Sequence, residues 1–327
     1  NATEEFLSQS SFNKLIILDS LKYGQNIEKI EFFSNKRITF IKGDINDKEL
    51  VLRLFSKYEI THVAHLAAES HVDHSINSPN DFIYSNINGT FNLLEAFRYH
   101  WNKNDNSPNW RFLYLSTDEV FGSLNKFDKP FDEFSIHDPS SPYSASKSSA
   151  EQLSKAWYKT YDLPIIILNC TNNYGPYQYS DKLIPLVIKR ILNGDKIPVY
   201  GDGKNIRDWI HVKDHCRAIR MIIDKGKIGD TYCVGSNSEI SNIDLIRIIC
   251  EQLEELSIAY KKEKSLSLLE FTKDRLGHDF RYAINSNKIR STIDWKPKFN
   301  LKNGLKNTIS WYLNNKMWLE MNINSRT

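Results

Sequence analysis

Tyr143 and Lys147 are the residues of this 327-residue chain whose types and spacing most directly suggest chemistry. They are four positions apart, so on a helix their side chains lie on one face, one turn apart. A tyrosine titrates near ~10, but an ammonium about 4 Å away, at an effective dielectric of about 20, favours the phenolate by about 4 kcal/mol. This would bring the tyrosine pKa to about 7 and make the residue a general base. The alternative is a chance pair at an exposed helix start, with Pro142 in the first turn.

Asp118 and Glu119 form a second candidate pair, within the triplet Thr117-Asp118-Glu119. The triplet follows an apolar run that predicts a strand, and at a strand end both carboxylates can reach one pocket. Neighbouring carboxylates in a low-dielectric pocket cannot both ionise easily, so one becomes a proton donor and the other an acceptor. Elimination of water needs such a pair, an acid for the leaving hydroxyl and a base for the carbon-bound hydrogen. The alternative is a solvated acidic loop.

The elements that must position these residues alternate along the first half of the chain. The end of a helix is expected before residue 12, strands over 14–19, 37–41, 61–68, 111–115 and 163–168, and helices over 48–58, 80–99 and 143–161. This order, with long crossovers, predicts an α/β fold with a doubly wound parallel Rossmann-type sheet. Ligands of such sheets bind beyond the carboxyl ends of the strands.

Several residues at those strand ends are candidate cofactor contacts. Asp19 ends the first strand, where an acid binds the adenosine ribose and selects NAD over NADP, unless it is only a turn residue. Asp44 would face the adenine, and the small Ala67 and Ala68 would let the backbone lie close to a flat cofactor. No G-x-x-G-x-x-G occurs in the chain. Either about 15 N-terminal residues are missing from the sequence, which the start at Asn1 favours, or the pyrophosphate-binding turn is lost.

The composition changes after the sixth predicted strand, because Pro, Gly and aromatic residues become denser over 175–209. We therefore expect a cofactor-binding domain over 1–174 and a smaller substrate lobe of α/β type over 175–327. Segments around 205–235 are candidates for packing back into the first domain. Within the lobe we expect a short strand ending at 234–235, an amphipathic helix over 243–256, and a surface loop or ragged helix over 257–269.

The overall composition excludes several classes of protein. The formal net charge of +3, with scattered basic residues, argues against a nucleic-acid footprint. No apolar run reaches membrane-spanning length, and no signal peptide opens the chain. The four cysteines lack metal or disulfide spacing, so we expect reduced core thiols in a cytoplasmic protein. His71 and His278 lack further ligand-like spacing, and no metal site is expected.

Seven motifs together resemble the extended short-chain dehydrogenase/reductases and, within them, the dTDP-glucose 4,6-dehydratases. They are LAAESHVD (66–73), STDEV (116–120), SPYSASK (141–147), NNYGP (172–176), KLIP (182–185), RDW (207–209) and DRLGH (274–278). Tyr-x-x-x-Lys marks only the superfamily, whereas Thr-Asp-Glu together with Asn-Asn-Tyr-Gly-Pro is more specific to the dehydratases. Related epimerases and decarboxylases usually carry Ser or another small polar residue where Asp118 and Glu119 stand. Leu276 departs from the usual proline.

The resemblance implies a hydro-lyase reaction of deoxysugar biosynthesis that converts dTDP-glucose into dTDP-4-keto-6-deoxyglucose with NAD. Tyr143, assisted by Lys147 and Thr117, would take the proton of the sugar 4-hydroxyl while hydride passes from C4 to NAD. Glu119 would then remove the C5 proton, which the 4-ketone acidifies, and Asp118 would protonate the departing 6-hydroxyl before hydride returns to C6. The alternatives are an epimerase or decarboxylase of the same family and a non-catalytic homologue without cofactor.

The resemblance also implies ligand contacts. The cofactor contacts would be Asp19, Ser20, Leu21, Lys22, Asp44, Ile45, Leu66, Ala67, Ala68, Ser70, Ser85, Tyr143, Lys147 and Asn173. The sugar-nucleotide contacts would be Ser70, Asn172, Lys182, Leu183, Pro198, Tyr200, Arg207, Asn242, Arg275 and His278. A diphosphate suits the guanidinium forks of Arg207 and Arg275, whose alternative is a surface ion pair. The helices over 80–99 and 143–161 look like the dimer-forming helices of the family, so a homodimer is expected.

Overall fold

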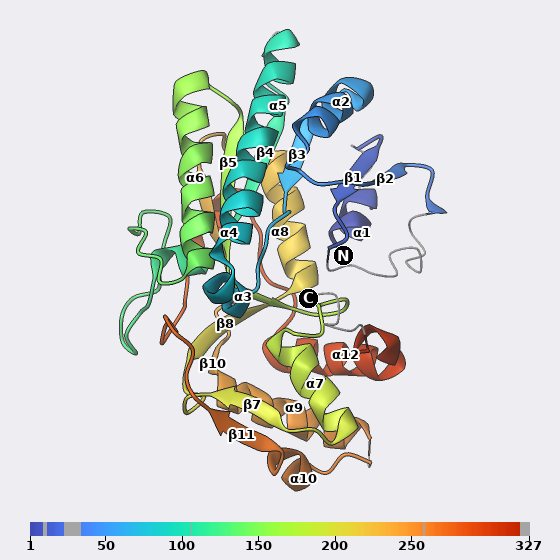
Figure 1. Ribbon diagram of the computed structural model, residues 1–327, viewed down its shortest axis with the longest axis vertical. Coiled ribbons are helices and arrows are strands. Elements are labelled where there is room, and N and C mark those ends of the chain that lie inside the picture. The colour runs from blue at the N-terminus through green and yellow to red at the C-terminus, as the bar shows by residue number, and fades with distance from the viewer. Residues whose placement is uncertain (9–11, 23–33, 105, 258, 321–327) are drawn as a thin grey trace.

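The computed structural model describes residues 1–8, 12–22, 34–104, 106–257 and 259–320 (Figure 1). The strands are β1 (Leu15–Asp19), β2 (Ile38–Lys42), β3 (His62–His65), β4 (Arg111–Thr117), β5 (Ile165–Cys170), β6 (Asn172–Tyr174), β7 (Ile197–Tyr200), β8 (Ile206–His211), β9 (Thr231–Val234), β10 (Glu239–Ser241) and β11 (Leu269–Thr272). The α-helices are α1 (Ala2–Leu7), α2 (Lys48–Tyr58), α3 (Val72–Asn77), α4 (Pro79–Phe82), α5 (Gly89–Lys103), α6 (Pro142–Tyr161), α7 (Leu183–Asn193), α8 (Val212–Lys225), α9 (Asn242–Leu256), α10 (Lys262–Leu266), α11 (Asn287–Ile293) and α12 (Leu301–Asn314). A π-helix, η3 (Ile83–Asn88), and two 3-10 helices, η4 (Asp118–Phe121) and η5 (Lys316–Trp318), complete the described elements.

A parallel sheet with the strand order β3-β4-β5-β9 forms the centre of the larger lobe. Successive side chains of β4 point to opposite faces, as in any strand. Phe112 and Tyr114 pack with residues of α5 and α6, whereas Leu113 packs with residues of α8. Helices therefore cover both faces (Figure 1), and the predicted doubly wound α/β fold is confirmed.

The parallel strands are divided more than the sequence predicted. β1 pairs with β2, in parallel, and this pair has no hydrogen-bonded partner strand among the described residues. The predicted strand over 61–68 ends at His65, so Leu66–Ala68 lie in the connection beyond it. Ladder hydrogen bonds join backbone groups whatever the side chains, so apolar patterning alone could not show where pairing stops.

The predicted helix over 80–99 is interrupted. It begins at Pro79, passes through the π-helical η3 and continues as α5 to Lys103. Within η3, the buried Asn86 accepts a hydrogen bond from the Glu69 amide at 2.8 Å and donates to the Ser146 hydroxyl at 2.8 Å. These tertiary bonds accompany the wider turn, and π segments of this kind often occur at functional positions.

The smaller lobe is built on a separate core. β8 pairs with β6 in parallel and with β10 in antiparallel orientation, while β11 pairs with β7. Around them α7, α9 and α12 contribute Ile188, Leu245, Ile249 and Ile309 to one buried cluster with Trp209. The region over 257–269, expected as a loop or ragged helix, contains α10 and the start of β11.

Helix α6 is the element that carries the candidate base. Ser141 caps it, because its hydroxyl accepts from the Ser144 amide while Ser144 bonds back to the Ser141 backbone, and Pro142 follows at the first helical position. The helix ends as predicted at Tyr161, since Asp162 adopts a left-handed conformation. Its buried face includes Tyr143, Lys147 and Glu151, which are spaced by one turn each.

No helix among the described residues is long and apolar enough to cross a membrane. All four cysteines are buried and free of disulfides.

Candidate active site

The acid pair lies at the carboxyl end of β4, where the strand passes into η4. Thr117 is the last residue of β4, and its hydroxyl donates to Asp118 Oδ1 at 3.3 Å and accepts from the Glu119 amide at 3.3 Å. Asp118 is 1% exposed. The alternative of a solvated acidic loop is therefore wrong.

The two carboxyl groups have different electrostatic surroundings. Burial, and then the neighbouring Glu119, raise the pKa of Asp118 well above its ordinary value. Its Oδ2 atom is buried and has no hydrogen-bond partner among the described residues. Burial also raises the pKa of Glu119, but the positive charges of Arg207, Arg275 and Lys182 act in the opposite direction. Asp118 is therefore the better proton donor of the pair and Glu119 the better acceptor.

Tyr143 lies in the same site as the acids, since Glu119 and Asp118 both act on its charge. Burial is the largest cause that raises the pKa of Tyr143 well above its ordinary value, and a hydrogen bond from Thr117 acts to lower it. The prediction that Lys147 brings this pKa to about 7 is wrong for the arrangement in the structure. The Lys147 ammonium donates instead to the Leu115 carbonyl at 2.6 Å and lies 4.4 Å from the centre of the Tyr114 ring.

Arg207 reaches the acid pair from β8 in the smaller lobe. Its guanidinium is buried and donates to the carbonyls of Ile206 at 2.7 Å and Asp279 at 3.0 Å, with the Tyr282 ring centre 4.2 Å away. The alternative of a surface ion pair is therefore wrong for Arg207. Burial lowers its pKa, although an arginine remains charged at neutral pH.

Arg275 lies at the rim between the lobes, in the loop after β11. It pairs with Asp73 of α3 at 3.6 Å, and Tyr200 of β7 donates to the same carboxylate at 3.2 Å. Its Nε atom is buried without a partner among the described residues. Nearby, His278 pairs with Asp274 at 2.6 Å, and Lys182 donates to the Ser70 carbonyl at 2.9 Å. The Asp73 carboxylate thus brings Arg275 and Tyr200 together.

The remaining predicted positions are distributed over several elements. Asn172 is in β6, Leu183 opens α7, Pro198 is in β7 and Asn242 opens α9. Ser20, Leu21 and Lys22 follow β1, Ile45 follows β2, Ala68 and Ser70 precede α3, and Ser85 is in η3. Lys22 forms an ion pair with the buried Glu69 at 2.6 Å. The Asn173 side chain bonds to His215 at 2.8 Å rather than to a residue of the acid pair.

The predicted cofactor positions are compatible with a bound dinucleotide. Asp19 is exposed at the end of β1, with Oδ1 accepting from the Leu21 amide at 2.7 Å, and Asp44 caps its own turn through the Asn46 amide at 2.8 Å. Leu66, beyond β3, is 41% exposed and offers an apolar surface to a flat ring. Ser116 Oγ is buried beside Thr117 with no partner among the described residues. Such an orphaned polar atom fits a ligand-binding position.

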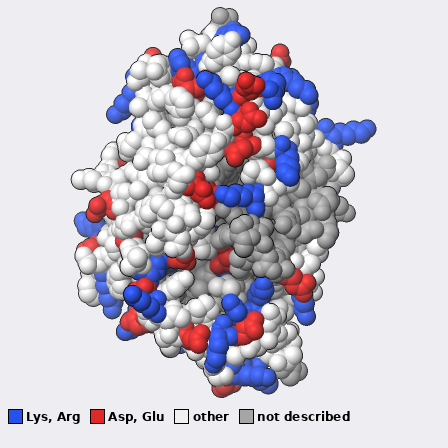
Figure 2. Space-filling model, in the orientation of Figure 1, with Lys and Arg blue, Asp and Glu red and all other residues white. Residues whose placement is uncertain are grey.

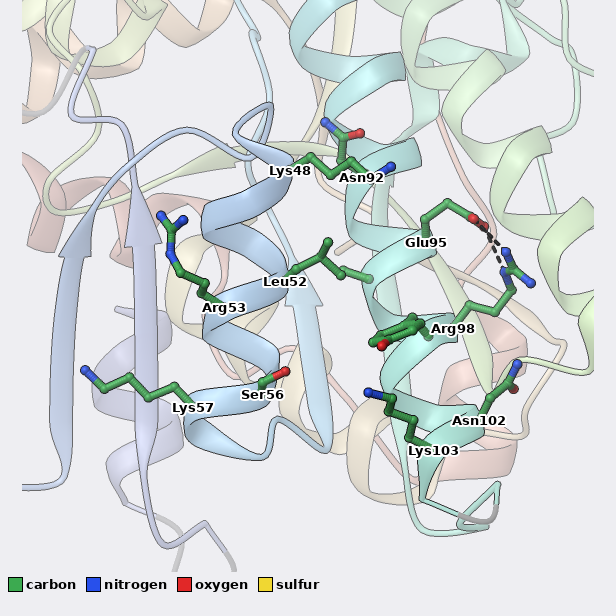
Figure 3. A pocket seen from close by; sticks show the side chains of 12 residues that line it. Lys48, Leu52, Arg53, Ser56, Lys57, Asn92, Glu95, Arg98, Asn102 and Lys103 are labelled. Carbon is green, nitrogen blue, oxygen red and sulfur yellow. Dashed lines mark hydrogen bonds and ion pairs between the residues drawn. The ribbon is translucent and has the colours of Figure 1, made fainter.

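The rest of the described structure offers no metal site and one hollow away from the acid pair. Among the described residues, no cluster of three or more His, Cys, Asp or Glu side chains could hold a metal ion. A hollow on the outer side of α2 and α5 is lined by Lys48, Arg53, Asn92, Glu95 and Tyr99, among others (Figure 3), and includes none of the predicted site residues.

Four residues of the region were not predicted. Asp73 binds Tyr200 and Arg275, and it stands at the end of the LAAESHVD motif. Asp279, next to His278, accepts from Ser140 at 2.7 Å and acts on the charge of Glu119. The Asn169 side-chain amide donates a hydrogen bond to Glu151 Oε2 at 2.9 Å, behind the acid pair. Two of the four residues carried a local signal: Asp73 belongs to the LAAESHVD motif, and Glu151 is one helical turn from Lys147.

Comparisons with known proteins identify the family of this chain. The family model of GDP-mannose 4,6 dehydratase matches residues 2–308. A dTDP-glucose 4,6-dehydratase of Neisseria meningitidis is 44% identical over 331 residues, covering 99% of this chain and 93% of the relative. The solved structure of DesIV, a dTDP-glucose 4,6-dehydratase from Streptomyces venezuelae with NAD bound, is similar at a TM-score of 0.87 and 34% identity, covering 98% of this chain and 94% of that one. A dTDP-glucose 4,6-dehydratase from Bacillus anthracis in complex with NAD follows at 0.83 and 37%, covering 98% and 94%.

A parallel α/β fold with Tyr-x-x-x-Lys on a helix beside the strand ends defines an enzyme of the short-chain dehydrogenase/reductase class. Within that class the chain belongs to the GDP-mannose 4,6 dehydratase family and, in it, to the dTDP-glucose 4,6-dehydratases. The resemblance stated from the motifs is confirmed.

Proposed function

We propose that this chain is a hydro-lyase that converts dTDP-glucose into dTDP-4-keto-6-deoxyglucose with NAD. The observation that carries the proposal is the pair Asp118 and Glu119 beside Tyr143, in which the pKa of Asp118 is raised well above its ordinary value while three cations oppose the rise at Glu119. An epimerase that only oxidises and re-reduces C4 has no use for a second acid and base of this kind. The pair therefore favours dehydration over epimerisation or decarboxylation.

The first step needs a base at the sugar 4-hydroxyl. Tyr143 takes that proton, and the hydrogen bond between Thr117 and the Tyr143 hydroxyl favours the phenolate. Residues at the ends of β1, β2 and β3 together with Lys147 would hold NAD, which would supply a reversible hydride acceptor for the sugar. Because burial opposes a phenolate at position 143, ligand binding must supply stabilising charge before the base is competent.

The elimination step uses the acid pair. A 4-ketone acidifies the hydrogen on C5, since the resulting carbanion is an enolate, and Glu119 removes that proton. Asp118, whose raised pKa favours the protonated form, donates to the departing 6-hydroxyl so that it leaves as water. The two carboxyl groups thus perform opposite proton transfers across C5 and C6.

The substrate's diphosphate would be bound by cations that already surround Glu119. Arg207 and Arg275 offer planar donor forks, and Lys182 adds a point charge from the start of α7. The same cations lower the pKa of Glu119, so they also help to keep the base ionised.

The reaction is tested by incubating the purified chain with dTDP-glucose and NAD and following the alkaline absorbance of a 4-keto-6-deoxy sugar. We expect product with dTDP-glucose and a slower reaction with UDP-glucose as the competing substrate. Retained NAD in the purified protein would support its role as a cofactor regenerated in each turnover. A 4-epimer as the product, with no keto sugar, would refute the proposal.

We further propose two lobes, a cofactor-binding lobe over 1–174 and a substrate lobe over 175–327. The pairing of β9 with β5 and the packing of α8 against the central sheet support a return of residues around 205–235 to the first lobe. A cytoplasmic location is proposed on the four free, buried thiols, because disulfides persist mainly in oxidising compartments.

A homodimer through α5 and α6 is the final part of the proposal. Large apolar side chains are exposed along η3, α5 and α6, namely Ile83, Tyr84, Phe91, Tyr99 and Tyr161. Figure 2 shows few charged side chains at the left, where Figure 1 has α6. Exposed apolar patches of this kind commonly mark association surfaces. Sedimentation equilibrium that detects only monomer at micromolar concentration would refute the dimer.

A further inference from the structure

The face of α6 that carries Tyr143 and Lys147 continues with two more charged residues at the same spacing, Glu151 and Lys155. Glu151 is 0% exposed. Its Oε1 accepts from Lys155 at 2.7 Å and lies 3.2 Å from His137 Nε2, and its Oε2 accepts from Asn169 at 2.9 Å. A carboxylate with no exposed surface is unusual and is tolerated only when it is fully hydrogen-bonded.

The charge of Lys147 lacks a direct partner. The ammonium is 4% exposed, donates to a backbone carbonyl, and forms no ion pair with any described residue. Burial lowers the pKa of Lys147 to about 8, and negative charge on Cys170 and on Glu151 acts to raise it. The pKa of Cys170 is itself raised to about 12, mainly by burial, so its thiol is neutral at pH 7. Glu151 is therefore the permanent negative charge that acts on Lys147 at neutral pH.

Burial alone would raise the pKa of Glu151, but the bonds and charges of His137 and Lys155 outweigh it and lower that pKa to about 2. The titratable and charged groups that face the Glu151–Lys147 pair come from every neighbouring element. They are Lys155 on α6, His137 before α6, His65 on β3, Tyr114 on β4, Cys170 on β5 and Cys233 on β9. His65, with its pKa lowered to about 3 mainly by burial, is neutral, as are the tyrosine and both thiols.

Glu151 is also connected to the acid pair through the backbone. Asn169, on β5, donates to Glu151 and also to the Thr117 carbonyl at 3.3 Å. Thr117 precedes Asp118 and Glu119, so the network joins α6, β5 and the end of β4 directly behind the reacting groups. Both donor bonds of the Asn169 amide are therefore used inside this network, while its Oδ1 atom is buried without a partner among the described residues.

We propose that Glu151 is a positioning residue of this site, which stabilises the buried Lys147 ammonium by its charge and fixes the Thr117 backbone through Asn169. This inference deepens the proposed function and rests on it for the role of Lys147 in the reaction. Glu151 touches neither Tyr143 nor the acid pair, so it acts through other residues.

The test is the titration of Lys147 in the full chain, followed by NMR with 13Cε-labelled lysine and assigned with Lys147→Arg. Glu151→Gln keeps the shape of the side chain but removes its charge, so the pKa of Lys147 should fall by about one pH unit. The alkaline limb of kcat should move down by the same amount. Glu151→Asp, which retains a carboxylate, should restore most of the shift.

Lys155→Gln is the matched control, because it breaks the 2.7 Å bond to Glu151 but removes a positive charge instead. If Glu151 had a purely structural role, Glu151→Gln and Lys155→Gln would change the Lys147 pKa in the same direction. The proposal instead predicts an unchanged or raised Lys147 pKa in Lys155→Gln. An unchanged Lys147 pKa in folded Glu151→Gln would overturn the proposal. If that variant does not fold, a lowered Lys147 pKa in Lys155→Gln overturns it equally. The titration needs no substrate, so its result is independent of whether the chain dehydrates dTDP-glucose.

Discussion

At the scale of single residues, two adjacent carboxyl groups acquire different chemistry from their surroundings. Asp118 is buried and Glu119 is half-buried. Arg207, Arg275 and Lys182 all act to lower the pKa of Glu119, with Arg207 as the strongest. At Asp118 only Arg207 acts in this direction, and the carboxylates of Glu119 and Asp208 oppose it. The division of labour between an acid and a base therefore depends on residues from the smaller lobe.

Arg207→Gln should make Glu119 harder to ionise. Since the base works only when ionised, activity falls as the pH drops through the pKa of Glu119, which is already raised above its ordinary value. Loss of the Arg207 charge raises that pKa further, so the acid limb of kcat should move to higher pH by about one unit.

The control for this pH profile is Arg53→Gln on α2, whose side chain is 64% exposed and far from the site. Arg53→Gln should leave the acid limb of the kcat profile at the pH of the unaltered chain. An acid limb that stays fixed in Arg207→Gln would contradict the assignment of Glu119 as the base.

The shared helix face of Tyr143 and Lys147 could be predicted from the sequence, but the pKa of Tyr143 could not. Helical periodicity placed both side chains on one buried face of α6, as observed. The Leu115 carbonyl, from a strand 32 positions away, takes the ammonium, and burial raises the pKa of Tyr143. A local sequence motif does not show how deeply its side chains are buried or which distant backbone group accepts their hydrogen bonds.

At the scale of elements, the π-helical segment η3 connects the end of β3 to α6. Asn86 bonds to both backbone groups of Glu69, at 2.8 and 3.0 Å, and to Ser146 on α6. Asn86→Ala should lower the free energy of unfolding by about 1–3 kcal/mol, because it leaves buried polar groups without partners. Urea denaturation of the folded chain measures this change.

Asn88→Ala is the matched control within the same segment, since Asn88 is exposed and makes no side-chain cap. Its effect on stability should stay within about 0.5 kcal/mol. Equal losses in the two variants would mean that helix propensity, rather than the Asn86 bonds, stabilises η3.

Element positions were predicted well where apolar periodicity was strong and poorly where tertiary bonds decide. The helix over 48–58 begins and ends as predicted, and β5 and α9 lie within two residues of their predictions. The π segment and the early end of β3 depend on Asn86, Glu69 and strand pairing, which are properties of the fold rather than of a window of sequence.

At the scale of the whole molecule, the proposed dimer depends on an apolar face rather than on the active site. Tyr84→Glu combined with Tyr99→Glu places charge on side chains that are 53% and 52% exposed. Sedimentation equilibrium should show this variant as a monomer. Buried charge in the contact would cost more than association supplies.

Phe271→Glu is the control, because Phe271 is similarly exposed, at 59%, but lies on β11 in the smaller lobe. It should sediment like the unaltered chain. Dissociation by the Phe271 variant, or a dimer that survives both tyrosine changes, would show that α5 and α6 are not the interface.

The parallel topology could be predicted because alternating elements and right-handed crossovers leave few arrangements. The contacts between the two lobes could not be predicted from the sequence. Asp73 on α3 meets Arg275 and Tyr200, which lie 202 and 127 positions away in the chain. Only the folded chain brings them together at the rim of the site.

The central claim is that Asp118 donates the proton that lets the sugar hydroxyl leave as water. It is tested most directly by the rate of keto-sugar formation from dTDP-glucose in Asp118→Asn, compared with Asp138→Asn, the same change at an exposed aspartate of the following loop. We predict a loss of about 10²- to 10⁴-fold for Asp118→Asn and an unchanged rate for Asp138→Asn. A rate for Asp118→Asn equal to that of the unaltered chain would contradict the account.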